Sequence, residues 1–271
     1  PGPHGRITRD DVKRSTDGGK AAPAPARPAA APAPAAAGAE ERVALRGLRN
    51  RIAEAMVKSK FTAPHFTYIE EVDVTELVTL REEAKAIAQA KGVKLTYLPF
   101  VVKALIQGLR QFPMMNASLD EAKGEIVLKR YYHIGIATHT TNGLLVPVVR
   151  DADKKTILAI ASEISDLSER ARGGKATSDE LRGSTFTITS TGNVGGVLAT
   201  PIINHPEVAI MGVHVIKDRP AVRNGQIVDR KMMNLSLSFD HRVIDGQIGA
   251  EFTNVVKQYL EEPKLLLLES I

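Results

Sequence analysis

The sequence contains no cysteine and no tryptophan, and aromatic residues make up only 4% of its 271 positions. Without cysteine, the chain can form no disulfide, no thiolate metal site and no cysteine nucleophile. No apolar run approaches the roughly 18 residues that a membrane-spanning helix needs. The net charge is only +5, and with so few aromatic rings for base stacking the composition argues against nucleic-acid binding. The remaining composition is that of an ordinary globular protein.

Residues 21–39 hold twelve alanines and five prolines. Such a segment cannot bury a core, and its prolines prevent a continuous helix, so we expect a semi-stiff linker over residues 15–41. Residues 1–14 are too short to fold alone, and we interpret them as the end of a truncated module. Because the chain begins with Pro1 rather than Met, we expect it to be part of a longer protein. Residues 42–271 are then the folded domain.

Helical and strand patterns alternate after the linker, which predicts an α/β (α+β) fold with a mixed sheet and packed helices. The predicted helices span 47–60, about 74–90, 97–112, 156–172 and 246–261. The predicted strands span 65–74, 125–129, 131–139, 144–149, 184–190, 207–217 and 232–239. Asp73 and Glu76 have the spacing of a capping box. Asn224-Gly225 is typical of a tight turn between two strands.

The stretch SFDHRVIDG (238–246) places a histidine, an arginine and two aspartates directly after an apolar strand. One interpretation is a charged turn that only reverses the chain. The other is a proton-transfer site, because a neutral imidazole is the usual general base near neutral pH. Asp245 lies four residues after His241 at the start of a predicted helix, where a carboxylate suits the helix dipole. The spacing alone leaves both interpretations open.

A second candidate site is TFTITSTGNVGG (185–196), a strand that leads into a glycine-rich loop. A phosphate-binding loop is disfavoured, because no lysine follows the glycines and Pro201 interrupts any helix there. A hydroxyl from Thr189, Ser190 or Thr191 at the strand end is better placed to donate to a developing oxyanion. Such residues are also common in strands, so a purely structural role stays open. No histidine pair shows zinc-type spacing, so no metal site is expected.

Four segments together resemble one known family: DHRVIDG (240–246) after its apolar strand, TFTITSTGNVGG, TPIINHPEVAIMGV (200–213) and NGLLVPVVR (142–150). They are similar to the catalytic domain of the dihydrolipoamide acyltransferases, the core subunits of 2-oxo acid dehydrogenase complexes. The resemblance runs from about residue 42 to residue 271. Residues 1–14 look like the end of the family's peripheral-subunit-binding module. The resemblance further implies a lipoyl group carried on an upstream domain that this sequence does not contain.

The family's fold is that of chloramphenicol acetyltransferase, with trimers whose active sites lie between subunits. By resemblance, His241 would deprotonate the thiol of coenzyme A (CoA), and the thiolate would attack the S-acyl thioester of the lipoyl arm. Thr189 would stabilise the tetrahedral intermediate through its hydroxyl, and Asp245 would match the acidic or amide partner in the last motif. The absence of cysteine fits this chemistry, since both thiols belong to the substrates.

CoA contacts carry over from the family to Lys103, Ser118, Thr189 and Ser190. Where relatives of the branched-chain type place an aspartate and a glycine near CoA, this chain has His139 and His214. The residues leave the acyl group open among acetyl, succinyl and branched-chain groups.

The expected partners are further copies of the chain, the 2-oxo acid decarboxylase and the dihydrolipoamide dehydrogenase. We expect trimers that form a cage of about 24 rather than about 60 subunits, with the apolar end KLLLLESI (264–271) between trimers. The expected location is the bacterial cytoplasm, or the mitochondrial matrix in a eukaryote. Two alternatives are a catalytically inactive scaffold core and a stand-alone acetyltransferase of the same fold. The intact His241, Asp245 and Thr189 argue against the first, and the linker argues against the second.

Overall fold

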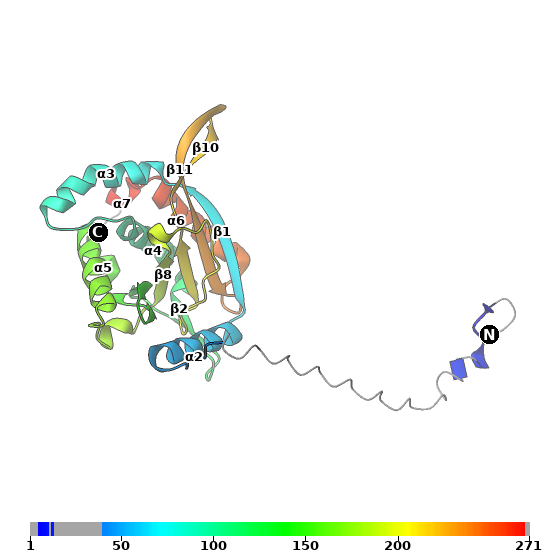
Figure 1. Cartoon of the computed structure of the whole chain (residues 1–271). Coiled ribbons are helices and arrows are strands. Elements are labelled where there is room, and N and C mark those ends of the chain that lie inside the picture. The colour runs from blue at the N-terminus through cyan, green and yellow to red at the C-terminus, as the bar shows by residue number, and fades with distance from the viewer. Residues whose placement is uncertain (1–4, 11, 14–39, 269–271) are drawn as a thin grey trace. The chain divides into compact units, whose positions relative to one another are not determined.

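The computed structural model describes residues 5–10, 12–13 and 40–268 and separates two compact units, Pro1–Ala44 and Leu45–Ile271. In the first unit, residues 9–10 and 12–13 are helical. The predicted linker lies outside the described residues up to residue 39, so its boundaries stay a prediction. The second unit carries the sheet and the candidate site (Figure 1). Among the described residues, no helix is both long enough and apolar enough to cross a membrane.

A seven-stranded mixed sheet forms the centre of the second unit, in the order β1-β11-β9-β8-β4-β7, with β10 paired to β11. Its strands are β1 (His65–Asp73), β4 (Ile134–Ile136), β7 (Val148–Val149), β8 (Phe186–Ser190), β9 (Ala209–Val213), β10 (Lys217–Arg223) and β11 (Gln226–Asp240). Strands β4, β8 and β9 run parallel, and the other pairings are antiparallel. Two small sheets pair β2 (Ala117–Asp120) with β3 (Glu125–Leu128) and β5 (Thr138–Thr140) with β6 (Gly143–Leu145). The predicted mixed sheet is confirmed.

The helices are α2 (Gly47–Thr62), α3 (Thr75–Ala90), α4 (Leu98–Gln111), α5 (Ile157–Arg172), α6 (Gly246–Glu261) and the short α7 (Leu265–Leu268). Helix α4 is buried along nearly its whole length and packs on α6. The two helices approach closely at Gly108, where an added Cβ would lie 2.8 Å from the ring of Phe252. The core between helices and sheet contains the fully buried rings of Phe186, Phe239 and Phe252.

Three predicted strands are wrong in extent. The strand expected at 131–139 is divided into β4 and β5, and that at 144–149 into β6 and β7. In the second case Pro147 lies at the break and has no N–H to donate to a ladder. The strand expected at 207–217 ends at Val213, and β10 begins only at Lys217.

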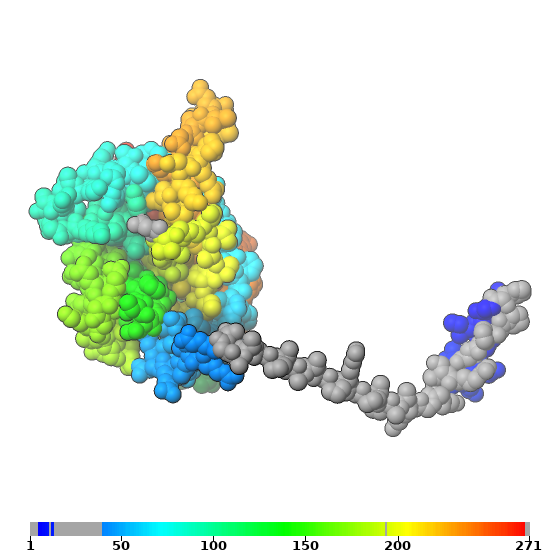
Figure 2. Space-filling model, viewed as in Figure 1, coloured from blue at the N-terminus to red at the C-terminus, as the bar shows by residue number. Residues whose placement is uncertain are grey.

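Strand β11 is also longer than predicted, because β10 and β11 form a hairpin that extends beyond the rest of the domain (Figures 1 and 2). The two-residue turn Asn224-Gly225 has positive φ angles of 52° and 77°, as a type I′ turn requires. The predicted turn is therefore confirmed. Away from the sheet, the tip has little to pack against, and Ile227 is 78% exposed.

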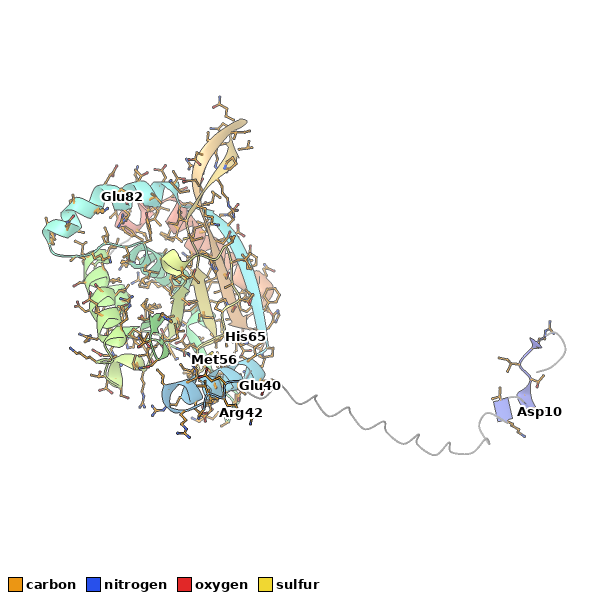
Figure 3. All side chains as sticks on the ribbon, viewed as in Figure 1. Asp10, Glu40, Arg42, Met56, His65 and Glu82 are labelled. Carbon is orange, nitrogen blue, oxygen red and sulfur yellow. The ribbon has the colours of Figure 1, made fainter. Side chains whose placement is uncertain are left out.

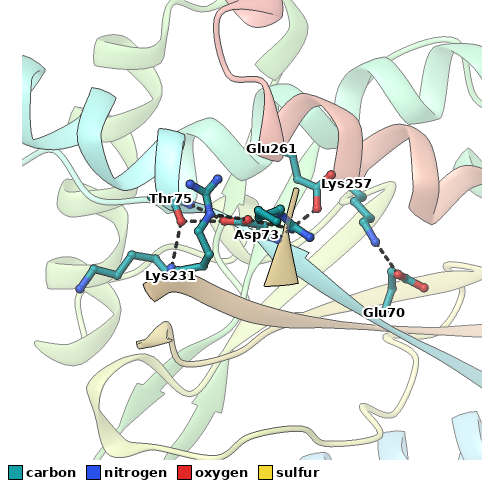
Figure 4. Close-up of polar contacts among 8 residues, drawn as sticks. Glu70, Asp73, Thr75, Lys231, Lys257 and Glu261 are labelled. Carbon is teal, nitrogen blue, oxygen red and sulfur yellow. Dashed lines mark hydrogen bonds and ion pairs between the residues drawn. The ribbon is translucent and has the colours of Figure 1, made fainter. Parts of the chain in front are cut away.

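Asp73 ties both strands of this hairpin to the domain (Figure 4). Its buried carboxylate accepts hydrogen bonds from Arg223 at 2.9 Å, from Arg230 at 2.7 Å and from the Thr75 hydroxyl at 2.6 Å. The predicted capping box is wrong, because Val74 is the N-cap of α3 and these partners occupy the carboxylate of Asp73. Burial alone raises the pKa of Asp73, but the hydrogen bonds from Thr75, Arg230 and Arg223 outweigh it and lower the pKa to about 2.

Replacing Asp73 by Asn should lower the melting temperature at pH 7, because the charged hydrogen bonds are lost. A folded-state pKa below that of the unfolded chain contributes stability above the unfolded value, near pH 4, and loses it as the pH falls toward about 2. The difference from wild type should therefore be about 2 kcal/mol at pH 7 and shrink below pH 4. Calorimetry across this range measures it. Asp218→Asn, which removes an exposed pair with Lys231 on the same hairpin, should change stability by less than about 1 kcal/mol. Equal losses in both variants would contradict the assigned role of Asp73.

Candidate active site

The charged residues around His241 divide into a structural pair and an exposed imidazole. Asp240, the last residue of β11, is buried. Arg242 forks around its carboxylate, with Nε 3.0 Å from Oδ1 and Nη2 2.7 Å from Oδ2. Arg242 also donates to Glu121 at 2.8 Å beside the β2–β3 sheet. Two parallel bonds to one carboxylate fix both direction and distance, so the turn that carries His241 is rigid.

His241 lies between these two residues with its side chain exposed. Its main-chain N–H donates to the carbonyl of Pro64 at 2.9 Å. Its ring meets the ring of Phe66 edge-on, with centroids 5.2 Å apart. Phe66 in turn packs on Phe239, its register partner on β11, with centroids 5.3 Å apart. The imidazole is therefore fixed on one side and free on the other, as a group that receives a proton from a substrate must be.

Asp245 is the N-cap residue of α6, and its side chain is exposed and makes no capping hydrogen bond. The predicted helix start is confirmed. The carboxylate stays near the positive end of the α6 dipole. It follows His241 within the same short turn, so both groups lie at the same end of the sheet.

The second candidate segment leads into a large cavity. Ser190, Thr191 and Gly192 line a space of about 1130 Å³ together with residues of α5, of the stretch before α4 and of β9 and β11. Thr189 does not line it, because side chains alternate along a strand and those of Ile188 and Ser190 face the cavity instead. After β8 only a three-residue 3-10 turn follows, Gly192–Val194. The loop therefore lacks the helix N-terminus of a phosphate-binding loop.

One chain does not bring His241 and Thr189 together. Thr189 pairs with Gly212 on β9, and Gly212 pairs with Ser236 on β11, which lies five residues before His241. With about 3.3 Å per residue along a strand and about 4.8 Å between strands, the two main-chain positions are roughly 19 Å apart. A site that uses both residues must therefore combine two copies of the chain.

The expected CoA contacts are also dispersed. Lys103 is buried in α4, and its ammonium group donates to the carbonyls of Asp153 at 3.2 Å and Lys155 at 3.1 Å. Burial lowers the pKa of Lys103. Ser118 is half-buried on β2, in the small sheet whose turn carries Glu121 and so reaches Arg242. Lys103 thus braces the connection before α5, whereas Ser118 lies toward the His241 end of the domain.

His139 and His214 both line the cavity. His139 is exposed on β5. His214 is 6% exposed, and its Nε2 lies 2.7 Å from the hydroxyl of Ser236, while its buried Nδ1 has no hydrogen-bond partner. Burial lowers the pKa of His214. Burial therefore favours the neutral form of this ring, which lies in the cavity wall.

Sequence reasoning did not predict three features of the site: the Asp240–Arg242 ion pair, His65 and Glu207. A local pattern could have indicated the ion pair, because Asp240 and Arg242 flank His241. No local pattern pointed to His65 or Glu207, because Ile203, the second partner of His65, and Ser184 and Thr187, two partners of Glu207, are distant in the chain. Glu207 is fully buried and accepts hydrogen bonds from Thr187 at 2.9 Å and Asn204 at 2.9 Å, and also from Ser184. Burial raises the pKa of Glu207 to about 7, against these hydrogen bonds.

The mixed sheet, its packed helices and the exposed histidine after β11 fit a catalytic domain of the acyltransferase class. More specifically, the chain belongs to the family of 2-oxoacid dehydrogenases acyltransferase (catalytic domain), whose family model matches residues 37–268. The predicted family is confirmed.

Curated relatives match almost the whole chain. The dihydrolipoyllysine-residue acetyltransferase component of the pyruvate dehydrogenase complex of Bacillus subtilis is 46% identical over 279 residues, which cover 99% of this chain and 63% of the relative. The protein of the same name from Staphylococcus aureus (strain Mu50) is 47% identical, with 99% of this chain and 66% of the relative covered. This chain thus spans less than two thirds of either relative.

Solved structures of the family agree with the fold. Dihydrolipoamide acetyltransferase of Azotobacter vinelandii superposes with a TM-score of 0.82 at 40% identity, covering 88% of this chain and 99% of that one. A truncated catalytic core of the 2-oxoacid dehydrogenase multienzyme complex from Thermoplasma acidophilum gives a TM-score of 0.76 at 46% identity, covering 83% and 99%. A third, the cubic core of a pyruvate dehydrogenase multienzyme complex, gives 0.82 at 40% identity, covering 88% and 99%.

Arg242→Lys tests whether the fork holds the turn. Lysine keeps the charge but cannot make two parallel bonds to Asp240, so the position of His241 should loosen. We expect kcat for acyl transfer to fall by about tenfold or more, with little change in KM for CoA. Steady-state kinetics measure both. Arg170→Lys, which alters an ion pair with Glu180 on the surface of α5, is the matched control and should leave both unchanged. An unaltered kcat in Arg242→Lys would show that the fork does not position His241.

Proposed function

We propose that this chain transfers an acyl group from an S-acyl-dihydrolipoyl arm to CoA, as the catalytic core of a 2-oxo acid dehydrogenase complex. The observation that carries the proposal is the exposed imidazole of His241 on a turn braced by Asp240 and Arg242. The family membership of residues 37–268 supports it. The acyl group we propose is acetyl, because relatives 46% and 47% identical are named as the acetyltransferases of pyruvate dehydrogenase complexes.

In the proposed reaction His241 accepts the proton of the CoA thiol, and the thiolate attacks the thioester carbon of the acyl-dihydrolipoyl arm. The carbonyl oxygen becomes an oxyanion, to which Thr189 of a second copy donates a hydrogen bond. When the intermediate collapses, the carbon–sulfur bond to the lipoyl arm breaks and the leaving thiolate takes the proton from His241. His241 has then returned the proton that it accepted, and its imidazole is neutral again.

The proposed substrate contacts come from the family resemblance. We propose that Ser118, Thr189 and Ser190 contact CoA, while Lys103 keeps its ammonium group on the carbonyls before α5. The cavity beside Ser190 has a volume large enough to admit a thin thiol-bearing arm. His139 and His214 line it. Asp245 lies beside the site at the start of α6 and is proposed to assist His241.

Complementation between two inactive variants tests both the chemistry and the shared site. His241→Ala should lower acyl transfer to CoA by at least about 100-fold, and Thr189→Ala by about 100- to 1,000-fold. If each site takes His241 from one subunit and Thr189 from another, co-expressed variants that assemble at random regain about one quarter of the wild-type rate. The rate is measured on purified mixed assemblies with acetyl-, succinyl- and isobutyryl-dihydrolipoamide.

Each variant purified alone is the control, and both must assemble like wild type. Mixed assemblies as inactive as the single variants would show that both residues act within one chain or that one of them acts only through folding. A His241→Ala protein within about tenfold of the wild-type rate would remove the imidazole from the mechanism. Preference for a substrate other than the acetyl compound would change the proposed acyl group and leave the reaction type intact.

The C-terminal leucines are proposed to join trimers into a cage. Leu266 is buried in its own chain, but Leu267 and Leu268 are 61% and 79% exposed. Residues 269–271 of the predicted contact lie outside the described residues. Burial of each exposed leucine against another trimer would contribute roughly 1.5 to 3 kcal/mol, repeated by symmetry. The cubic core among the structurally similar proteins supports a cage of about 24 subunits.

Changing Leu267 and Leu268 together to Ser should release smaller particles that still transfer acyl groups, because each site is completed within a trimer. Sedimentation velocity gives the particle size, and the CoA assay gives the rate. Ile87→Ser, at an isoleucine on α3 that is 63% exposed, is the matched control and should keep the wild-type size. Cages that survive the double change would refute this role for the leucines, and monomers would mean that they hold the trimer itself.

A further inference from the structure

His65, the first residue of β1, lies where that strand meets α2 (Figure 3). Its Nδ1 is 2.7 Å from the carbonyl of Ala63, and its Nε2 accepts a hydrogen bond from the main-chain N–H of Ile203 at 3.0 Å. A carbonyl only accepts and a main-chain N–H only donates, so the partners determine the tautomer. The ring is neutral, with its hydrogen on Nδ1 and a lone pair on Nε2.

The segment that His65 holds, residues 63–66, supports His241 through two contacts. The carbonyl of Pro64, between Ala63 and His65, accepts the main-chain N–H of His241. The next residue, Phe66, supplies the ring that His241 contacts edge-on. Both the backbone and the imidazole of His241 therefore rest on residues 63–66.

The other partner of His65 belongs to a well-fixed loop, residues 201–206. Ile203 is fully buried, and its carbonyl accepts a hydrogen bond from the hydroxyl of Ser59 on α2 at 2.6 Å. The following residue, Asn204, donates to the buried carboxylate of Glu207 at 2.9 Å. His65 thus links this loop by a hydrogen bond to residues 63–66, which support His241.

We propose that His65 is a positioning residue for acyl transfer, whose neutral, Nδ1-protonated ring ties residues 63–66 to the loop at Ile203 and so fixes His241. The proposal rests on the proposed function, in which His241 is the base. His65 touches no reacting atom in it. A displacement of about 1 Å at a reacting group changes rates by up to about 100-fold, so a link one residue from the support of His241 affects kcat more than substrate binding.

The link is specific to the neutral ring. An imidazolium carries a hydrogen on both nitrogens, so a second proton on His65 would set Nε2–H against the N–H of Ile203. Two N–H groups that face each other repel, so the loop at Ile203 and residues 63–66 would move apart.

Three variants of the full chain test the proposal, each checked for assembly before kinetics. His65→Leu removes both bonds and should lower kcat by about 10- to 100-fold, with KM for CoA within about twofold of wild type. His65→Gln can still accept from Ile203 but does not titrate, and it should recover about tenfold of that loss. His133→Leu is the matched control, because the His133 ring also accepts a main-chain N–H, from Asp151 at 3.0 Å, and His133 precedes β4, which β9 and β8 separate from β11. It should lower the melting temperature like His65→Leu while keeping the wild-type kcat.

The split between kcat and KM and the rescue by His65→Gln separate positioning from a purely structural role. A His65→Leu kcat within about threefold of wild type, an equal kcat loss in His133→Leu, or a His65→Gln kcat no higher than that of His65→Leu would each overturn the proposal. If the wild type transfers no acyl group to CoA, or if His241→Ala keeps the rate, the proposed function fails first, and that result is distinct from a failure at His65 alone.

Discussion

The hydrogen-bond ladder of β11 is the constraint on which the other features of this domain depend. Its 15 residues pair with β1, β9 and β10, so one strand runs from the tip of the projecting hairpin to the turn at His241. The register of that ladder determines that Asp240 is opposite His65 and that Ser236 is opposite Gly212. A shift of one residue would turn every side chain of β11 to the other face and remove the support of His241.

The ladder also separates the chemistry of the domain into two halves. His241 lies at the end of β11, whereas Thr189 lies on β8 at the level of Ser236. Strands are rigid along their length, so no side-chain motion closes a gap of roughly 19 Å. Subunit assembly and catalysis are therefore coupled in the proposed function, because the chain that supplies the base must meet another chain that supplies the oxyanion donor.

Buried polar groups hold the irregular parts of the domain in place. Asp73 holds the two strands of the hairpin through one arginine on each, Asp240 fixes the turn through Arg242, and Glu207 fixes the loop before β9. Each carboxylate has several donors, as a buried acidic group needs if it is not to destabilise the fold. Glu207 differs from Asp73, since burial raises the pKa of its carboxyl to about 7 while the pKa of Asp73 is lowered. The deeper burial of Glu207 and the two arginines that donate to Asp73 account for the contrast.

The sequence by itself determined the local features. The helix at 246–261, the Asn224-Gly225 turn and the strand end before His241 follow from spacing, propensity and positive φ, which act between near neighbours. Tertiary structure decided what depends on distant pairing. The arginine partners of Asp73 are about 150 residues away, His65 meets Ile203 across the fold, and the distance between His241 and Thr189 follows from strand order. These contacts left no local pattern, because a strand's neighbours and register are fixed by the packing of the whole sheet.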